Sequence, residues 1–160
     1  MARVEVSAPD EVAIVHVMNC VVRRYYLLGD DLVSGKNYDH CKVMIENQLQ
    51  RLAGAFGVDL LGFAIMSNHF HLILRSRPDV VLTWDDTEVA RRWLLICPVR
   101  KNSADPLSST AGEPEEPNEF ELNSIRNDPR KLEIPRLRLS DLGWWMRVLC
   151  RERRDTEEAE

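Results

Sequence analysis

The residues most able to do chemistry are two histidines, His69 and His71, in a segment that reads Ser-Asn-His-Phe-His-Leu-Ile-Leu over residues 67–74. The apolar residues around them predict a β-strand, and side chains two apart in a strand lie on one face. Neutral imidazole is a common ligand of divalent metal ions, so the spacing indicates half of a metal site. The alternative is a structural pair satisfied by hydrogen bonds at the edge of the core.

A strand and a crossover helix are predicted before this pair. Valine and isoleucine predict a strand over residues 12–22, with His16 on one of its faces. Apolar residues at helical spacing predict an amphipathic helix over residues 38–56, which Gly57 ends. If the first strand lies beside the histidine strand, His16 becomes a further candidate ligand.

The region around and beyond the pair predicts more elements. Residues 58–66 and 71–75 predict two strand segments, joined either as a hairpin or as one long strand, and we favour a bend at Ser67-Asn68. Asp85 and the two residues after it predict the start of a helix that ends before Pro98. This order of strands and helices indicates an α+β sandwich.

The last third of the chain begins with an acidic stretch rich in proline and serine, residues 102–118, which predicts a loop or linker. A weak helix near 120–126, a basic arm and a helix capped by Ser140 follow. We therefore divide the chain into an α+β core over residues 1–101, the linker over 102–118 and a helical C-terminal segment over 119–160.

The residues around the histidine pair resemble a known family. The chain reads Ile-Val-His-Val-Met-Asn over 14–19 and, after the predicted helix, Gly-Phe-Ala-Ile-Met-Ser-Asn-His-Phe-His-Leu over 62–72. This order and spacing resemble the HUH nucleases, specifically the single-tyrosine transposases of small bacterial insertion sequences and the REP-associated tyrosine transposases. The resemblance covers residues 12–101, with a weaker similarity over 139–150. It implies a ferredoxin-like sandwich, in which helices cover one face of an antiparallel sheet.

The resemblance also implies an activity, that of a DNA transposase that cleaves and rejoins single-stranded or hairpin DNA. In this family a tyrosine attacks a phosphodiester and becomes linked to the 5′ phosphate. By this resemblance His69 and His71 would hold Mg²⁺ or Mn²⁺, which polarises the scissile phosphate. An amide or carboxylate side chain near the tyrosine completes the metal site. Members of the family commonly form homodimers.

The chain departs from the family at the catalytic residue, which in compact members is a tyrosine on a helix after the histidine motif, followed one turn later by a ligand that is often glutamine. Here no tyrosine follows Tyr38 and no glutamine follows Gln50. Tyr25, Tyr26 and Tyr38 precede the histidine strand, where packing roles are commoner, so the catalytic residue is left unassigned. Acidic residues that could stand in as the third ligand, none of them selected by its spacing, are Glu119, Glu121, Glu133 and Asp141.

Two explanations fit this departure. The chain is either a truncated copy of a longer transposase or a catalytically inactive derivative that only binds DNA. A helical pattern changes after Cys150 to the charged run of residues 151–160, which suits a frameshift or early stop, and we favour truncation as the hypothesis. A small interaction domain whose histidines are structural is a third reading.

The net charge of −5 argues at first against a nucleic-acid partner, because Lys and Arg drive phosphate binding. However, residues 1–104 carry 12 basic and 12 acidic residues, whereas residues 105–160 carry 9 and 14. The histidine-bearing part is therefore neutral. Within it we predict that nucleic acid contacts two basic pairs, with ordinary solvated surface as the alternative. These pairs are Arg23 with Arg24, and Arg75 with Arg77.

Composition limits the location of the protein. No run of about 18 apolar residues is present, so no membrane span is expected, and the N-terminus lacks the features of a signal peptide. Four cysteines without a C-x-x-C pair indicate reduced thiols in a reducing compartment and argue against a structural zinc site. We therefore expect a cytoplasmic protein.

Overall fold

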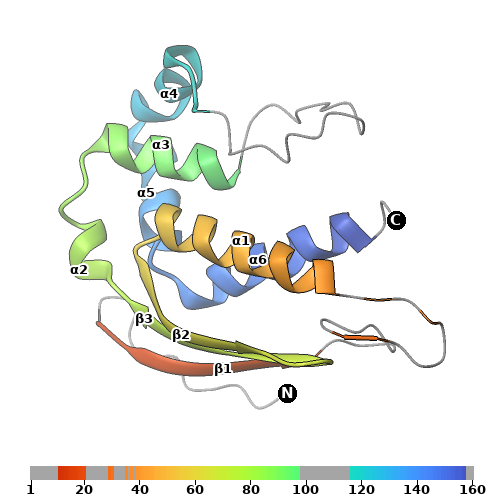
Figure 1. The fold of residues 1–160 in the computed structure, drawn as a ribbon. Coiled ribbons are helices and arrows are strands. Elements are labelled where there is room, and N and C mark those ends of the chain that lie inside the picture. The colour runs from red at the N-terminus through yellow and green to blue at the C-terminus, as the bar shows by residue number, and fades with distance from the viewer. Residues whose placement is uncertain are drawn as a thin grey trace.

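The computed structural model describes residues 11–20, 29, 30, 35, 37, 39–97 and 116–157 of the 160-residue chain (Figure 1). Its strands are β1 (Ile14–Cys20), β2 (Val58–Ile65) and β3 (His69–Ser76). Its helices are α1 (Asp39–Ala55), α2 (Pro78–Val81), α3 (Asp86–Ile96), α4 (Glu119–Arg126), α5 (Pro129–Arg138) and α6 (Leu142–Glu157). None of the helices within these ranges is both long and apolar enough to span a bilayer.

The three strands form one antiparallel sheet in the order β1-β3-β2. Because β1 and β2 both run antiparallel to β3, they are parallel to each other, and α1 connects them in a split βαβ unit. Helices α1 and α6 cover one face of the sheet, and no described helix covers the other (Figure 1). The predicted α+β fold, an antiparallel sheet with helices on one face, is confirmed.

Strands β2 and β3 form a hairpin, so the bend favoured from the sequence is wrong. The two strands pair along their length, and the backbone N–H of Met66 donates to the carbonyl of His69 at 2.8 Å. Ser67 and Asn68 form the tight connection between the strands. Tight hairpin turns usually contain glycine, and Ser67-Asn68 does not, so the sequence did not predict a hairpin here.

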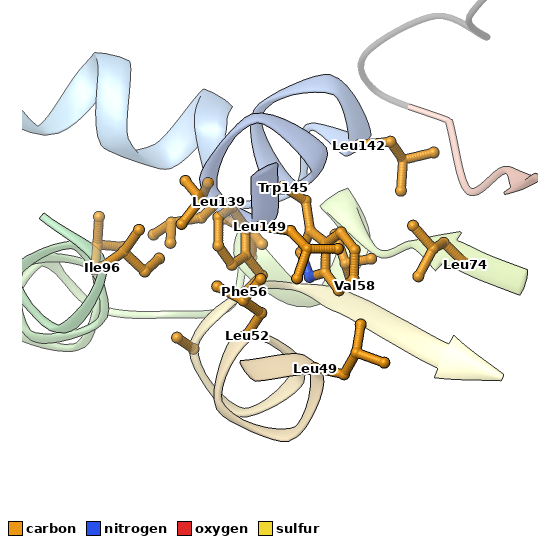
Figure 2. Close-up of a cluster of buried hydrophobic side chains, with 14 of the residues drawn as sticks. Leu49, Leu52, Phe56, Val58, Leu74, Ile96, Leu139, Leu142, Trp145 and Leu149 are labelled. Atoms are coloured by element: carbon orange, nitrogen blue, oxygen red, sulfur yellow. The ribbon is translucent and has the colours of Figure 1, made fainter. Parts of the chain in front are cut away.

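The hydrophobic core fills the space between the sheet and the helices (Figure 2). Alternate residues of β3, Phe70, Leu72 and Leu74, are at most 2% exposed and face this core. From α6 the indole of Trp145 is fully buried. Helix α1 contributes Ile45, Leu49, Leu52 and Ala55. The C-terminal helix is thus part of the same core as the sheet.

The helix starts follow the capping rules. Asp85 accepts a hydrogen bond from the backbone N–H of Glu88 at 2.7 Å, which confirms the predicted start of α3. Helix α6 is capped by Asp141, whose carboxylate accepts from the backbone N–H of Trp144. The predicted cap, Ser140, is therefore wrong by one residue. The predicted basic arm is also wrong, because those residues form α5.

Gly57 lies where α1 passes into β2 against two other segments. Its N–H donates to the carbonyl of Leu139, and its carbonyl accepts from Arg77, both at 2.8 Å. A Cβ at this position would lie 2.2 Å from Val81 Cγ2 and 3.3 Å from the Arg77 carbonyl oxygen. This close approach of backbone to neighbouring atoms requires glycine.

Replacing Gly57 with alanine is expected to lower the free energy of unfolding by about 1–3 kcal/mol, because the added methyl overpacks the junction. Gly54→Ala is the matched control, since a Cβ there meets nothing within 4 Å. That change is expected to be neutral or to stabilise by up to about 1 kcal/mol through better helix propensity. Urea denaturation compares the two variants, and equal stabilities would contradict the packing described for Gly57.

Candidate functional site

Three histidines share the face of the sheet that none of the described helices covers. Across the β1–β3 ladder, His16 is the partner of Ile73 and Met18 is the partner of His71. Residues of β3 alternate between the faces, so His69 and His71 lie opposite to the core-facing residues of that strand. The adjacency of the two strands, on which the candidacy of His16 depended, is confirmed.

The imidazole of His71 contacts the other two. His16 Nε2 lies 2.9 Å from His71 Nδ1, and the two rings are stacked with centroids 5.1 Å apart and an interplanar angle of 14°. The ring of His69 meets that of His71 edge to face, with centroids 5.1 Å apart and an angle of 80°. His71 is thus the centre of the cluster, with one neighbour on its own strand and one on β1.

The hydrogen bonds at Nδ1 of His69 and of His71 decide whether Nε2 of each ring is free to bind a metal. His69 Nδ1 lies 2.7 Å from Asn68 Oδ1, so Nδ1 carries the proton and the Nε2 lone pair is left for a ligand. In the hydrogen bond between His71 Nδ1 and His16 Nε2, either nitrogen is the donor, depending on the tautomers of the two rings. When the proton sits on His71, its Nε2 is also available. Each ring of the pair can therefore offer an Nε2 lone pair to a ligand.

A third protein ligand is not evident. Within the described ranges, no group of three or more His, Cys, Asp or Glu side chains is arranged to hold a metal ion. The four acidic candidates belong to α4, α5 and the start of α6, in the helical layer on the far side of the sheet (Figure 1). Within one copy of the chain they therefore lie away from the open face. These candidates are Glu119, Glu121, Glu133 and Asp141.

Arg75 lies on the same face as the histidines, four residues beyond His71, or about 13 Å along the strand. Its Nη2 is 2.6 Å from Asp59 Oδ2, and its Nε donates to the same oxygen at 2.8 Å. Asp59 is its register partner on β2. The guanidinium is thus held by a carboxylate of the neighbouring strand.

Arg77 is held by two carboxylates. Its Nη2 is 2.8 Å from Asp79 Oδ2, and its Nη1 is 3.4 Å from Asp59 Oδ2. The hydrogen bond between Arg77 and Asp79 raises the pKa of the arginine and lowers the pKa of the carboxyl group below its ordinary value. Phosphate would have to compete with these carboxylates, so a nucleic-acid role for Arg75 and Arg77 stays a prediction.

Sequence reasoning did not single out the apolar side chains beside the histidines as functional. Ile14 is 62% exposed, Met18 59% and Ile73 44%. Alternation showed which residues share a face, but it could not show that none of the described helices covers this one. Together with the histidines, these side chains form a surface of mixed apolar and imidazole character, which we call the open face.

The predicted nucleic-acid contacts Arg23 and Arg24 lie outside the described residues, so their role stays a prediction. The three tyrosines, to which no catalytic role was assigned, also lie outside them, and these are Tyr25, Tyr26 and Tyr38. The catalytic residue stays unassigned.

No family model, curated protein or solved structure matches the chain. The functional interpretation therefore rests on the residues and the geometry of the open face.

Proposed function

We propose that this chain is a DNA transposase-like protein that binds a divalent metal ion through His69 and His71 and holds single-stranded or hairpin DNA against the open face. One observation carries the proposal. Two imidazoles, each able to present Nε2, gather on a sheet face that the described helices leave uncovered. A bound divalent ion would polarise a phosphodiester and stabilise the charge on its oxygens.

The residues around the pair support such a role by fixing it in place. Asn68 contacts Nδ1 of His69, and His16 contacts Nδ1 of His71, so each ring has a hydrogen-bond partner on the nitrogen opposite its free Nε2. Exposed Met18 and Ile73 offer apolar surface for unstacked bases. Bases in the unpaired part of the DNA would therefore contact Met18 and Ile73, and a phosphate of the same strand would lie against the histidines.

Between the two ions considered, the donor set favours Mn²⁺ over Mg²⁺. Mg²⁺ prefers oxygen ligands, whereas transition ions accept imidazole nitrogen. The remaining coordination positions would be filled by water or by phosphate oxygens of the DNA. We further propose a cytoplasmic location and a homodimer, both from the sequence and the family resemblance.

A second candidate is a catalytically inactive protein that binds the same DNA. The observation that favours it is the absence from this chain of a tyrosine after Tyr38 and of a glutamine after Gln50. Binding would then rely on stacking and on phosphate contacts, without bond cleavage.

A denaturing gel separates these functions. The protein is incubated with a labelled DNA hairpin that carries a single-stranded flank, with Mn²⁺ or with EDTA. A covalent protein–DNA adduct or a nick that requires Mn²⁺ would establish the transposase-like activity. DNA binding measured separately by fluorescence anisotropy, with neither product on the gel, would establish the second candidate. Binding that is indifferent to Mn²⁺, or no binding, would contradict the proposed metal site.

Replacing Asp59 with asparagine is expected to increase the affinity for DNA several-fold at low salt. The change removes one negative charge beside the open face and frees Arg75 to contact phosphate. Asp86→Asn is the matched control, because it removes the carboxylate partner of Arg136 in the helical layer. Fluorescence anisotropy at two salt concentrations measures both, and the gain is expected to shrink at high salt. Unchanged affinity for Asp59→Asn would contradict the position assigned to the DNA.

A further inference from the structure

A second surface, on the helical side of the molecule, carries a group of arginine side chains. Trp144, Arg147 and Arg151 lie on one side of α6, because positions three and four apart are neighbours on a helix. The other side of the helix is buried through Trp145 and Leu149. Both arginines are exposed. We call Trp144, Arg147 and Arg151, together with Arg138 of α5, the basic stripe.

The indole of Trp144 organises the stripe. The guanidinium carbon of Arg138 lies 4.2 Å from the centroid of this ring, and that of Arg147 lies 5.2 Å from it. Trp93 of α3 stacks on the same ring with centroids 6.0 Å apart and an angle of 17°. Cation–π contact holds a guanidinium group in place while leaving its N–H donors free for other partners. Three helices thus combine to fix two cations at one place.

The charges of the stripe are not neutralised within the described part of the chain. No carboxylate there pairs with Arg138, Arg147 or Arg151, whereas four other arginines of the helical layer have such partners. Those paired arginines are Arg91, Arg92, Arg126 and Arg136. Asp141, the acidic residue beside the stripe at the start of α6, uses its carboxylate to cap the helix. Among the described residues the three guanidinium groups of the stripe therefore have no carboxylate partner.

We propose that the basic stripe binds the phosphate backbone of a DNA segment. Guanidinium groups bind phosphate through paired N–H donors, and Arg147 and Arg151 are one helical turn apart, so they can take different phosphates of one strand. The Trp144 ring is already contacted by an indole and two guanidinium groups. It is therefore not a platform for a base, and the contact is independent of sequence.

The stripe is separate from the open face, since the sheet and the core lie between them (Figure 1). Its ligand would be a part of the DNA other than the segment at the histidines, and its binding would require no metal. The inference rests on the proposed function in that DNA is the ligand of both surfaces. The two surfaces nevertheless differ in their dependence on metal and on salt, which allows them to be tested apart.

The test compares the variant Arg147→Gln/Arg151→Gln with the wild type by fluorescence anisotropy, using the labelled hairpin with a single-stranded flank in EDTA. We expect affinity at low salt to fall about tenfold or more, and the slope of log affinity against log salt to become shallower by about 1.5 to 2. Arg130→Gln/Lys131→Gln removes the same charge from α5 outside the stripe and is the control. Circular dichroism and thermal unfolding establish that each variant is folded.

The outcomes separate the inference from the proposed function. Weaker binding in EDTA for the stripe variant, with its Mn²⁺-dependent gain in affinity retained, supports the stripe as an independent contact. Wild-type affinity and salt slope in the stripe variant overturn the inference, even where His69→Ala/His71→Ala removes the Mn²⁺-dependent gain. An equal loss in the Arg130→Gln/Lys131→Gln control also overturns it, because net charge alone would then account for the effect.

Discussion

Replacing Trp145 with alanine is expected to lower the free energy of unfolding by about 3–5 kcal/mol. Trp145 has no exposed surface, and it is the largest of the fully buried side chains in the described part of the chain. Figure 2 shows it among Leu149 of its own helix, Phe56 at the end of α1 and Val58 of β2. The alanine would leave a cavity at the point where the C-terminal helix meets the sheet. Because small domains are stable by only about 5–15 kcal/mol, such a loss removes a large fraction of the total.

Trp145→Phe is the control for this change. The indole Nε1 of Trp145 is buried without a hydrogen-bond partner in the described structure. Phenylalanine keeps most of the apolar volume and removes that unsatisfied donor, so its cost should stay below about 2 kcal/mol. Urea denaturation measures both variants. Wild-type stability in Trp145→Ala would contradict the placement of α6 in the core.

Replacing His71 with alanine is expected to weaken Mn²⁺ binding by more than about a hundredfold, and His69→Ala should do the same. Each change removes one of the two proposed ligands, and loss of a supporting residue alone typically costs 10–100-fold in metal affinity. Asn68→Ala should therefore have a smaller effect within that range, because it frees His69 to rotate without removing a ligand. Electron paramagnetic resonance of free Mn²⁺ measures the dissociation constants.

His40→Ala is the control for these variants. His40 is an exposed imidazole in the first turn of α1, outside the open face. Its replacement should leave the affinity for Mn²⁺ unchanged. An equal loss in His40→Ala, or wild-type affinity in His71→Ala, would show that any bound metal lies elsewhere in the protein.

Local patterns explain the parts of this molecule that could be predicted from its sequence. Alternation in the histidine strand placed His69 and His71 on one face, because the period of a strand is two. Helical spacing predicted α1, and Asp85 predicted the start of α3 through a capping contact three residues away. These signals act within a few residues of the chain, so they can be read without tertiary structure.

Contacts between distant segments explain what was missed. Asp59 and Arg75 are register partners on neighbouring strands, and strand register cannot be read from either segment alone. The sequence therefore presented Arg75 as an available cation. The basic stripe was also hidden, because Trp93, Arg138 and Trp144 come from three helices.

Nuclear magnetic resonance of the protein labelled with ¹⁵N at histidine tests the metal site most directly, because the chain has only four histidines. Mn²⁺ broadens the signals of nuclei close to it. We predict that a substoichiometric amount of Mn²⁺ broadens the ring signals of His69 and His71 most strongly, broadens those of His16 next, and leaves those of His40 sharp. No broadening, or broadening of His40 equal to that of the other three, would contradict a metal site on the open face.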